Sequence, residues 1–406
     1  MAGRESTNGN EQLPHTKLRR CGVIAGAAVG AFVAAAAMAT GAAAPAKADL
    51  DDLLDPIIQP ILTQVTDSLA SFDPTLATDL TTWTDSLLSS LNSLDSAAAA
   101  SSTAATAAAS SASDPASDPT GGEIPIVMKE DTEPTVQVTV DGSPTTLLVD
   151  TGSSGLVIPW DDLGFTKLLE LGLPTGGDFS AYSGGVGYFY LTYDTTVDYG
   201  GVVTTPDTPV DVEIFSFPTS LSSPDSFDLF DQDNDVTGVL GIGDSASASG
   251  PTESPLQAAG FNGVTVDIPA KELVIGSNAD VNADNVTLSG APTPTADLTE
   301  TVTTSGGQTV GTASVSDDID SGGVYGTIPS SIDSGTLAQG DVVTVKDGDT
   351  VLYSYTVGTD SLGTDEAPGV TSGTSIDSGV EPYLEEPIYI NYVDDTLTFD
   401  NPPLTG

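Results

Sequence analysis

Two aspartates in this chain occur in matching sequence contexts. Asp150 lies in "VDTGSSGLVIP" and Asp320 lies in "IDSGGVYGTIP". In both segments an apolar residue precedes the acid, a hydroxyl residue and Gly follow it, and Ile-Pro closes the segment at the same offset. Such an echo is expected from a duplicated half-domain with a pseudo-twofold axis. Asp150 and Asp320 are therefore candidates for a pair of cooperating carboxyl groups.

Two carboxyl groups held close together cannot both ionise, so they share one proton and their pKa values separate. The ionised group can take a proton from water while the protonated group polarises a substrate carbonyl. Gly after the acid lets each turn run close to its mate, and hydroxyl groups can hydrogen-bond across the turns or to a carboxylate. The residues expected to support the pair in these ways are Thr151, Gly152, Ser153, Ser321 and Gly322.

Asp-Ser-Gly after Ile is not unique in this chain. It occurs at Asp320, Asp333 and Asp377, and each acid is also explained as a turn residue that accepts backbone N–H groups. We select Asp320 because the whole segment from Ile319 to Pro329 matches the segment around Asp150. Asp333 is expected in a helix after Pro329. Asp377, in "TSIDSGVEPYL", remains the rival for the second carboxyl group.

The composition excludes several function classes. The 406 residues include 9 Lys+Arg and 58 Asp+Glu, which gives a net charge of -49. Such a chain cannot neutralise nucleic acid phosphates, and it is repelled by anionic membranes. No nucleic acid partner is therefore expected. The single Cys (Cys21) and the single His (His15) both lie close to the N-terminus.

The N-terminus predicts a signal peptide over 1–48. Basic residues precede a long Ala/Gly-rich run, and "AKA" at 46–48 fits an A-x-A cleavage site. The protein is then secreted or held at the cell surface. The alternative is a retained membrane anchor, since the run is long enough to span. Arg19-Arg20 leaves the choice between the Sec and Tat export routes open.

Cleavage at this site would remove both Cys21 and His15. The mature chain then has no Ser-His-Asp or Cys-His nucleophile, no His-ligated zinc and no disulfide. The remaining catalytic groups are carboxylates, hydroxyls, Lys or an oxygen-ligated metal. A calcium loop starting at Asp231 is disfavoured, because Val236 and Ile242 stand where the pattern needs Gly and Glu. We expect no metal and no cofactor.

The rest of the chain divides by composition. Residues 49–96 space Leu and Ile at helical intervals and predict a small helical segment, which is either a module for cell-envelope association or a spacer. Residues 97–121 are an Ala/Ser-rich linker, so a removable pro-region is a further alternative. Residues 122–406 alternate short Val/Thr/Ile/Tyr-rich runs with Gly, Asp and Pro turns, which predicts an all-β domain.

Residues 122–406 resemble a bilobal, pepsin-like aspartic protease, with lobes at about 122–255 and 256–406. The resemblance rests on the two Asp motifs, on "DVTGVLGIG" at 235–243 and on "LEEPIYINYVDDTLTFD" near the end. The layout is similar to mycobacterial aspartic proteases with an N-terminal helical region and linker. In that family "FSAYSGGVGYFYLTYDTTVDYGG" corresponds to the flap hairpin, which implies a substrate-binding role for Tyr182, Ser183 and Gly184.

Three features depart from the family pattern. Val157 stands where the family often has Trp, seven residues after the first Asp, and Trp160 comes later. "SVSDDI" rather than a clean apolar strand precedes the second motif, and no Pro-Glu pair opens the chain.

Two functions of different classes follow from the sequence. The first is a secreted, monomeric aspartic endopeptidase that acts on protein or peptide substrates through water activated between two carboxyl groups. The alternative is a catalytically inactive, protease-like binding protein of the cell surface.

Overall fold

The computed structural model describes most of the chain between residues 119 and 400. The described stretches are 119–129, 131–183, 185–218, 236–332, 337–358 and 367–400. The predicted signal peptide, the helical segment 49–96, nearly all of the linker, Gly184 and Asp333 lie outside the described residues. Within these stretches, no helix is long and apolar enough to cross a membrane.

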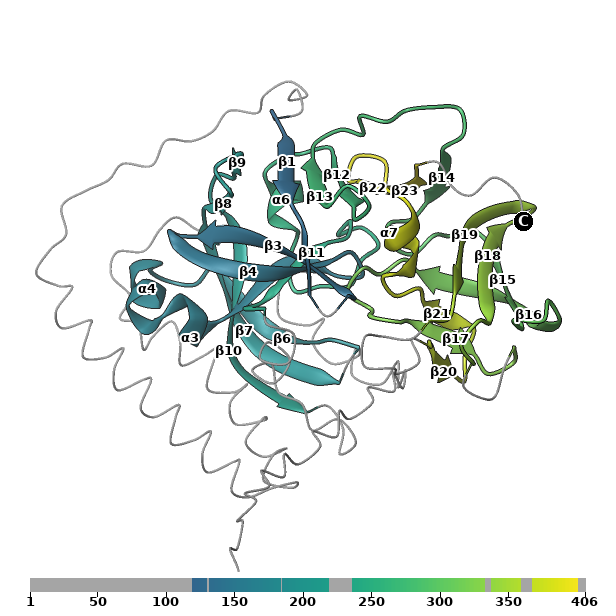
Figure 1. Ribbon diagram of the computed structural model, residues 1–406. Coiled ribbons are helices and arrows are strands. Elements are labelled where there is room, and N and C mark those ends of the chain that lie inside the picture. Colours follow the sequence, from purple (N-terminus) through teal and green to yellow (C-terminus); the bar gives the residue numbers. More distant parts are fainter. Residues whose placement is uncertain are drawn as a thin grey trace, which may run out of the picture. The chain divides into compact units, whose positions relative to one another are not determined.

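Strands dominate the described residues, which confirms the predicted all-β class. The helices in these stretches have six residues or fewer. They are α3 (Trp160–Leu163), α4 (Phe165–Glu170), α6 (Pro255–Ala258) and α7 (Glu381–Glu385). The sheets therefore position the candidate site, and α3 and α4 lie at the outer edge of the first sheet (Figure 1).

The first sheet carries Asp150. Its strand order is β6-β7-β10-β5-β11-β4-β3-β8-β9, and β2 pairs with β3 beside this path. The strands are β2 (Val127–Lys129), β3 (Glu133–Val140), β4 (Ser143–Asp150), β5 (Ser154–Pro159), β6 (Gly176–Ala181), β7 (Val186–Thr195), β8 (Val197–Tyr199), β9 (Val203–Thr204), β10 (Thr208–Pro218) and β11 (Val239–Ile242).

The second sheet leads to Asp320. Its order is β19-β18-β15-β16-β21, and β17 pairs with β20 next to it. The strands are β15 (Leu298–Thr303), β16 (Thr309–Asp318), β17 (Thr327–Pro329), β18 (Val342–Asp347), β19 (Thr350–Thr356), β20 (Gly369–Thr371) and β21 (Ser375–Asp377).

A third sheet draws on both ends of the described chain. Its order is β1-β13-β12-β22-β23-β14. The strands are β1 (Gly122–Pro125), β12 (Gly263–Asp267), β13 (Glu272–Ile275), β14 (Val286–Ser289), β22 (Ile388–Asn391) and β23 (Thr396–Phe399). In Figure 1 the blue strand β1 therefore stands among green and yellow strands that come much later in the sequence.

The core of the first sheet lies at β4, β5 and β11. The second half of β4 and all of β5 and β11 are buried. Strand β11 pairs in parallel with β4 and antiparallel with β5, and this register sets Gly241 opposite Asp150. A strand buried on both faces reads as a continuous apolar run, as "LLV" before Asp150 does.

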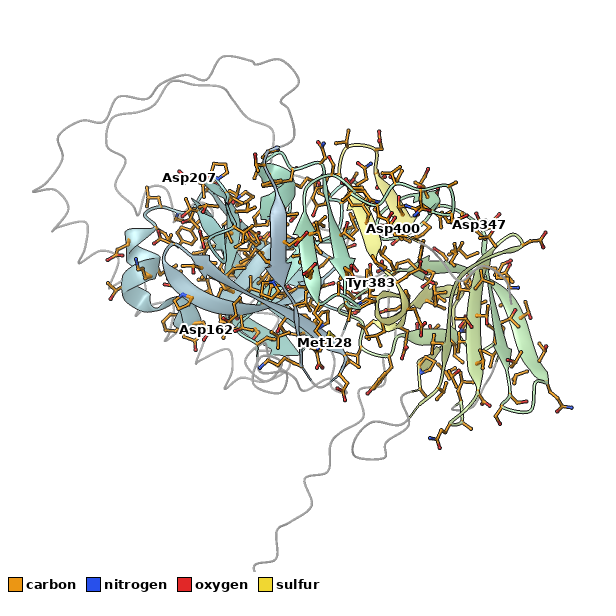
Figure 2. The ribbon with its side chains drawn as sticks, turned by 45° about the horizontal axis from the view of Figure 1, so that its top comes forward. Met128, Asp162, Asp207, Asp347, Tyr383 and Asp400 are labelled. Atoms are coloured by element: carbon orange, nitrogen blue, oxygen red, sulfur yellow. The ribbon has the colours of Figure 1, made fainter. Side chains whose placement is uncertain are left out.

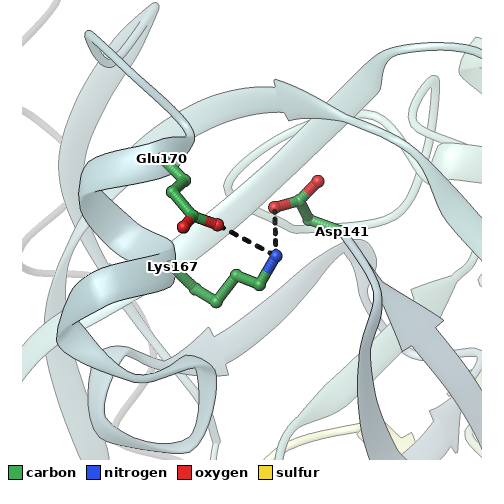
Figure 3. A network of polar contacts seen from close by, with 3 residues as sticks. All are labelled: Asp141, Lys167 and Glu170. Atoms are coloured by element: carbon green, nitrogen blue, oxygen red, sulfur yellow. Dashed lines mark ion pairs between the residues drawn. The ribbon is translucent and has the colours of Figure 1, made fainter.

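An ion-pair network ties helix α4 to the first sheet. Lys167 lies 3.0 Å from Glu170 on the same helix and 3.6 Å from Asp141 in the β3–β4 turn, as Figure 3 shows. Glu170 and then Asp141 raise the pKa of Lys167. Exposed pairs of this kind add little stability.

Candidate functional site

Asp150 lies at the end of β4, where the buried strand enters the "TGSS" loop, and it is 7% exposed. Ser153 donates two hydrogen bonds to its carboxylate. The Ser153 amide donates to Oδ1 at 3.2 Å and the hydroxyl donates to Oδ2 at 2.6 Å. These two hydrogen bonds fix the orientation of the Asp150 carboxyl group within its loop.

Asp320 lies two residues beyond β16 and is 9% exposed. Its amide donates to the Ser378 hydroxyl at 3.0 Å. Its carboxyl Oδ1 accepts hydrogen bonds from the amides of Gly322 at 2.8 Å and Gly152 at 3.1 Å. Because Gly152 belongs to the first loop, the loop of Asp150 contacts the second carboxyl group directly.

Thr151 and Ser321 connect the two loops through reciprocal hydrogen bonds. The Thr151 amide donates to Ser321 Oγ at 3.1 Å, and the Ser321 amide donates to Thr151 Oγ1 at 2.8 Å. Each hydroxyl also donates across the axis, Thr151 to Ile319 O at 2.8 Å and Ser321 to Val149 O at 2.7 Å. Both side chains are fully buried. The pattern has the twofold character that the repeated motif predicts.

The glycines of the two motifs stand against the opposite acids. A Cβ on Gly152 would lie 2.4 Å from Asp320 Cγ, and a Cβ on Gly322 would lie 3.0 Å from Asp150 Cγ. The first distance is far below van der Waals contact, and the second already requires a shift of the carboxyl group. Gly at both positions therefore allows the two carboxyl groups to approach each other.

The acids around Asp320 are crowded. Burial, and then the negative charge of Asp150, raises the pKa of Asp320 well above its usual range, with further contributions from Asp377 and Asp318. Burial likewise raises the pKa of Asp318 to about 7 and that of Asp377 to about 8. Burial and the neighbouring acids therefore favour the neutral form of Asp320, and Asp150 lies across from it with its carboxyl group accepting hydrogen bonds from Ser153.

The rival acid, Asp377, lies beside the pair rather than in it. It ends β21, opposite Asp318 in parallel register, and its Oδ1 accepts the Gly379 amide at 2.8 Å. A Cβ on Gly323 would lie 2.2 Å from this Oδ1. The acid that contacts the loop of Asp150 is Asp320, so the geometry favours the pair selected from the sequence echo.

The β6–β7 hairpin carries Tyr182 at its turn. The Tyr182 amide donates to Val186 O at 2.9 Å, and its ring stacks on Tyr188 with centroids 5.2 Å apart. Burial, then Tyr188 and Asp150, raises the pKa of Tyr182. Tyr182 packs against the buried cluster that contains Val157, Tyr188 and Val239. Tyr188 packs in one cluster with Val157, so it supplies an aromatic ring next to the position where the family often has Trp.

Ser183 follows Tyr182 in this turn and is exposed. It therefore projects away from the aromatic cluster beneath the hairpin. Its neighbour Gly184 lies outside the described residues.

Two residues contact the site without having been selected from the sequence. Tyr383 of α7 is fully buried, and its hydroxyl lies 2.9 Å from both Thr151 Oγ1 and Ile319 O. Ser378 accepts the Asp320 amide. The "IDSG" segment at 376–379 pointed to this region, but the group that contacts Asp320 is the Ser378 hydroxyl and not the Asp377 carboxyl group. No local pattern distinguishes Tyr383 from the other tyrosines near the C-terminus.

A family model described as the PE-PGRS C-terminal aspartyl peptidase-like domain matches residues 122–398. PE cleavage protein A of Mycobacterium tuberculosis strain H37Rv is 39% identical over 306 residues, which cover 70% of this chain and 52% of that protein. The Mycobacterium marinum protein of the same name is 38% identical over 308 residues, with 70% and 53% covered. The chain thus spans about half the length of the curated relatives it matches.

The comparison with solved structures includes the aspartic proteinase from Irpex lacteus. It is 15% identical to this chain, with a TM-score of 0.46, and the match covers 70% of this chain and 98% of that one.

Proposed function

The chain belongs to the family of the PE-PGRS C-terminal aspartyl peptidase-like domain, and on this premise we propose that it is an aspartic endopeptidase whose catalytic residues are Asp150 and Asp320. The observation that carries the proposal is the reciprocal hydrogen bonding of Thr151 and Ser321, which sets the two carboxyl groups against each other. The name of the relatives, PE cleavage protein A, assigns cleavage to those proteins and supports hydrolysis as the reaction here.

The proposed reaction begins with Asp150 ionised and Asp320 protonated. Asp150 takes a proton from a water molecule while the water oxygen bonds to the peptide carbonyl carbon. Asp320 gives its proton to the carbonyl oxygen, and a tetrahedral diol forms. The proton on Asp150 then passes to the amide nitrogen, the C–N bond breaks, and a diol proton returns to Asp320. The pair ends as it began, without a covalent enzyme intermediate.

The hairpin turn supports a peptide as the substrate. The Tyr182 ring is held at the turn by stacking on Tyr188, and we propose that this turn covers a chain segment bound over the two acids. A segment that passes between a hairpin and a pair of acids must be extended. We therefore propose unfolded proteins or flexible peptide segments as substrates, and Ser183 as a polar group available to them at the turn.

A cleavage assay tests this function. The exported protein is incubated with an unfolded protein such as reduced, alkylated casein between pH 3 and 7, and the products are identified by mass spectrometry. We expect internal cleavage that pepstatin suppresses. Cleavage that is insensitive to pepstatin would contradict the proposal, as would intact casein at every pH. In the second case, retention of the protein on casein without cleavage would favour the binding protein.

We also propose that the protein is exported and that the mature chain starts near Asp49. The basis is the signal-like sequence ahead of the "AKA" site. Edman sequencing of protein from the culture medium and from the cell surface should return an N-terminus at or close to this residue. An intact N-terminus in both fractions would contradict cleavage.

A further inference from the structure

Glu386 is a deeply buried acid outside the candidate active site. It is 3% exposed, and neither of its carboxyl oxygens has a hydrogen-bond partner among the described residues. Burial, and then the negative charge of Asp400, raises the pKa of Glu386 to about 8. Burying a carboxylate costs free energy unless the group is neutral or faces a cation. Glu386 is therefore either protonated or the ligand of a cation.

Strand pairing places a second acid beside Glu386. Asp400 follows β23, whose last residue pairs with the first residues of both β14 and β22. This register sets Asp400 between Asn285, which precedes β14, and Pro387, whose carbonyl accepts the Asp400 amide at 3.0 Å. Asp400 is 1% exposed, and Figure 2 labels it beside the yellow strands. Two buried acids thus lie on neighbouring segments at one end of the third sheet.

The loop before β14 adds amide groups to these acids. The side-chain amides of Asn278 and Asn285 donate to Asp400 Oδ1 at 3.0 and 2.5 Å. The Asn285 Oδ1 atom is itself buried without a hydrogen-bond partner in the described residues. Asp280, in the exposed part of the loop, acts together with burial to raise the pKa of Asp400 to about 6. Acceptor oxygens therefore outnumber donors around Asp400 and Glu386.

The sequence led us to expect no metal, but on these observations we propose that this cluster is a calcium site in which Glu386, Asp400 and the side-chain oxygen of Asn285 are ligands. Carboxylate and amide oxygens are the ligands that Ca²⁺ prefers, and its flexible coordination suits an irregular set completed by water. Asp280 adds negative charge at the exposed side. The described stretches contain no group of three His, Cys, Asp or Glu side chains that could hold a metal ion, so the proposed site has two carboxyl ligands, with the Asn285 oxygen and water as the others.

The charge of the chain supports an external cation here. After residue 48 the sequence contains no Arg and four Lys, namely Lys129, Lys167, Lys271 and Lys346. Side-chain cations are thus too few to neutralise the acids, and the strongly negative molecule attracts small cations. Sites with few charged ligands bind Ca²⁺ at Kd values on the order of 10⁻⁴–10⁻³ M, and we expect an affinity in that range.

The test uses the whole protein, freed of metal with EDTA at pH 7 and exchanged into metal-free buffer. The thermal midpoint is measured against CaCl2, MgCl2 and NaCl of matched ionic strength, and isothermal titration calorimetry gives the stoichiometry. We expect one Ca²⁺ per chain and a midpoint raised by about 3–6 °C at tenfold excess over the Kd. MgCl2 and NaCl should have little effect.

Matched variants locate the effect. Glu386→Gln keeps the shape of the buried side chain without its charge, and it should abolish both the Ca²⁺ heat and the midpoint shift. Glu385→Gln removes the same charge from the exposed neighbouring residue and should behave as wild type. Equal Ca²⁺ binding in Glu386→Gln would overturn the site. Absence of binding in the wild type up to 10 mM CaCl2, with Glu386→Gln simply more stable, would show that Glu386 is a protonated acid.

Discussion

At the residue scale, the hydroxyl groups of Thr151 and Ser321 hold together the two loops that carry the acids. Thr151 Oγ1 donates to Ile319 O and accepts the Ser321 amide, so one atom serves both loops. Ser321 mirrors this arrangement toward Val149. Buried polar networks are strong when every member is paired and weak when one is lost. The position of the two carboxyl groups therefore depends on four short contacts rather than on the acids alone.

Thr151→Val tests this network at nearly constant shape. The Ser321 amide would lose its acceptor inside the protein, and a buried group left unpaired costs about 1–3 kcal/mol. We expect the free energy of unfolding in urea to fall by at least that amount. Thr301→Val is the control, because the Thr301 hydroxyl pairs with Thr312 on an exposed face. Equal stability of Thr151→Val and the control would contradict the account.

Gly152→Ala tests the close approach of the two acids. The added methyl group would lie 2.4 Å from Asp320 Cγ and must displace that carboxyl group. Displacement of a catalytic group by about 1 Å can cost about 100-fold in rate, and we expect a loss of kcat of that order. Gly306→Ala is the control, since its nearest neighbour would be the Thr304 hydroxyl at 3.7 Å. Wild-type kcat in Gly152→Ala would contradict the placement.

At the element scale, the ends of paired strands hold the site. Asp150 is the last residue of strand β4, which pairs with β11. Asp320 follows strand β16, which pairs with β21. In each case the neighbour is a parallel strand from far along the chain. Parallel neighbours cannot come from a tight hairpin, so long connections bring these segments together.

The sequence predicts the first of these elements better than the second. "TTLLVD" is a clear strand because β4 is buried on both faces at its end. Strand β16 is exposed or half-buried except at Val315 and Asp317, and it stops at Asp318, two residues before Asp320. "SVSDDI" therefore lacks an apolar run although it leads to the second acid. Tyr383 was not predicted because its role depends on tertiary contact with Thr151, which no local pattern encodes.

Tyr188→Phe tests the hairpin as an element. Tyr182 and Tyr188 are stacked, and the Tyr188 hydroxyl interacts with the side chains of Ser180 and Tyr182. Loss of the Tyr188 hydroxyl should leave the stack intact and lower kcat/KM by about 2–10-fold, mainly through KM. Tyr199→Phe, in the same sheet, removes a buried hydroxyl that has no hydrogen-bond partner in the described chain and should have no effect. Identical kinetics in both variants would show that the Tyr188 hydroxyl does not position the turn.

At the scale of the whole molecule, both the buried acids and the net charge of -49 should lower the stability of the folded protein as the pH rises. Burial raises the pKa of Asp211 to about 6 and that of Glu300 to about 8. A folded state that holds protons above the usual carboxyl pKa is stabilised by acid, because the unfolded chain releases those protons first. Stability should therefore be full near pH 4 and fall as the pH rises to about 8.

Thermal unfolding between pH 4 and 8 measures this dependence. Each raised group contributes up to about 1.4 kcal/mol per pH unit between its unfolded and folded pKa values. Glu300→Gln should flatten the decline of the midpoint with pH, whereas Glu123→Gln, at an exposed position, should leave the slope unchanged. A midpoint that rises from pH 4 to 8 would contradict the assignment of buried, protonated acids.

The central claim is that Asp150 and Asp320, and not Asp377, form the catalytic pair. The most direct measurement is the rate of casein cleavage by Asp150→Asn, Asp320→Asn and Asp377→Asn, each verified as folded by circular dichroism. Removal of a general acid or base typically costs about 10²–10⁴-fold. We predict losses of that order in the first two variants and retained cleavage in Asp377→Asn. Cleavage that survives in Asp320→Asn but disappears in Asp377→Asn would contradict the account.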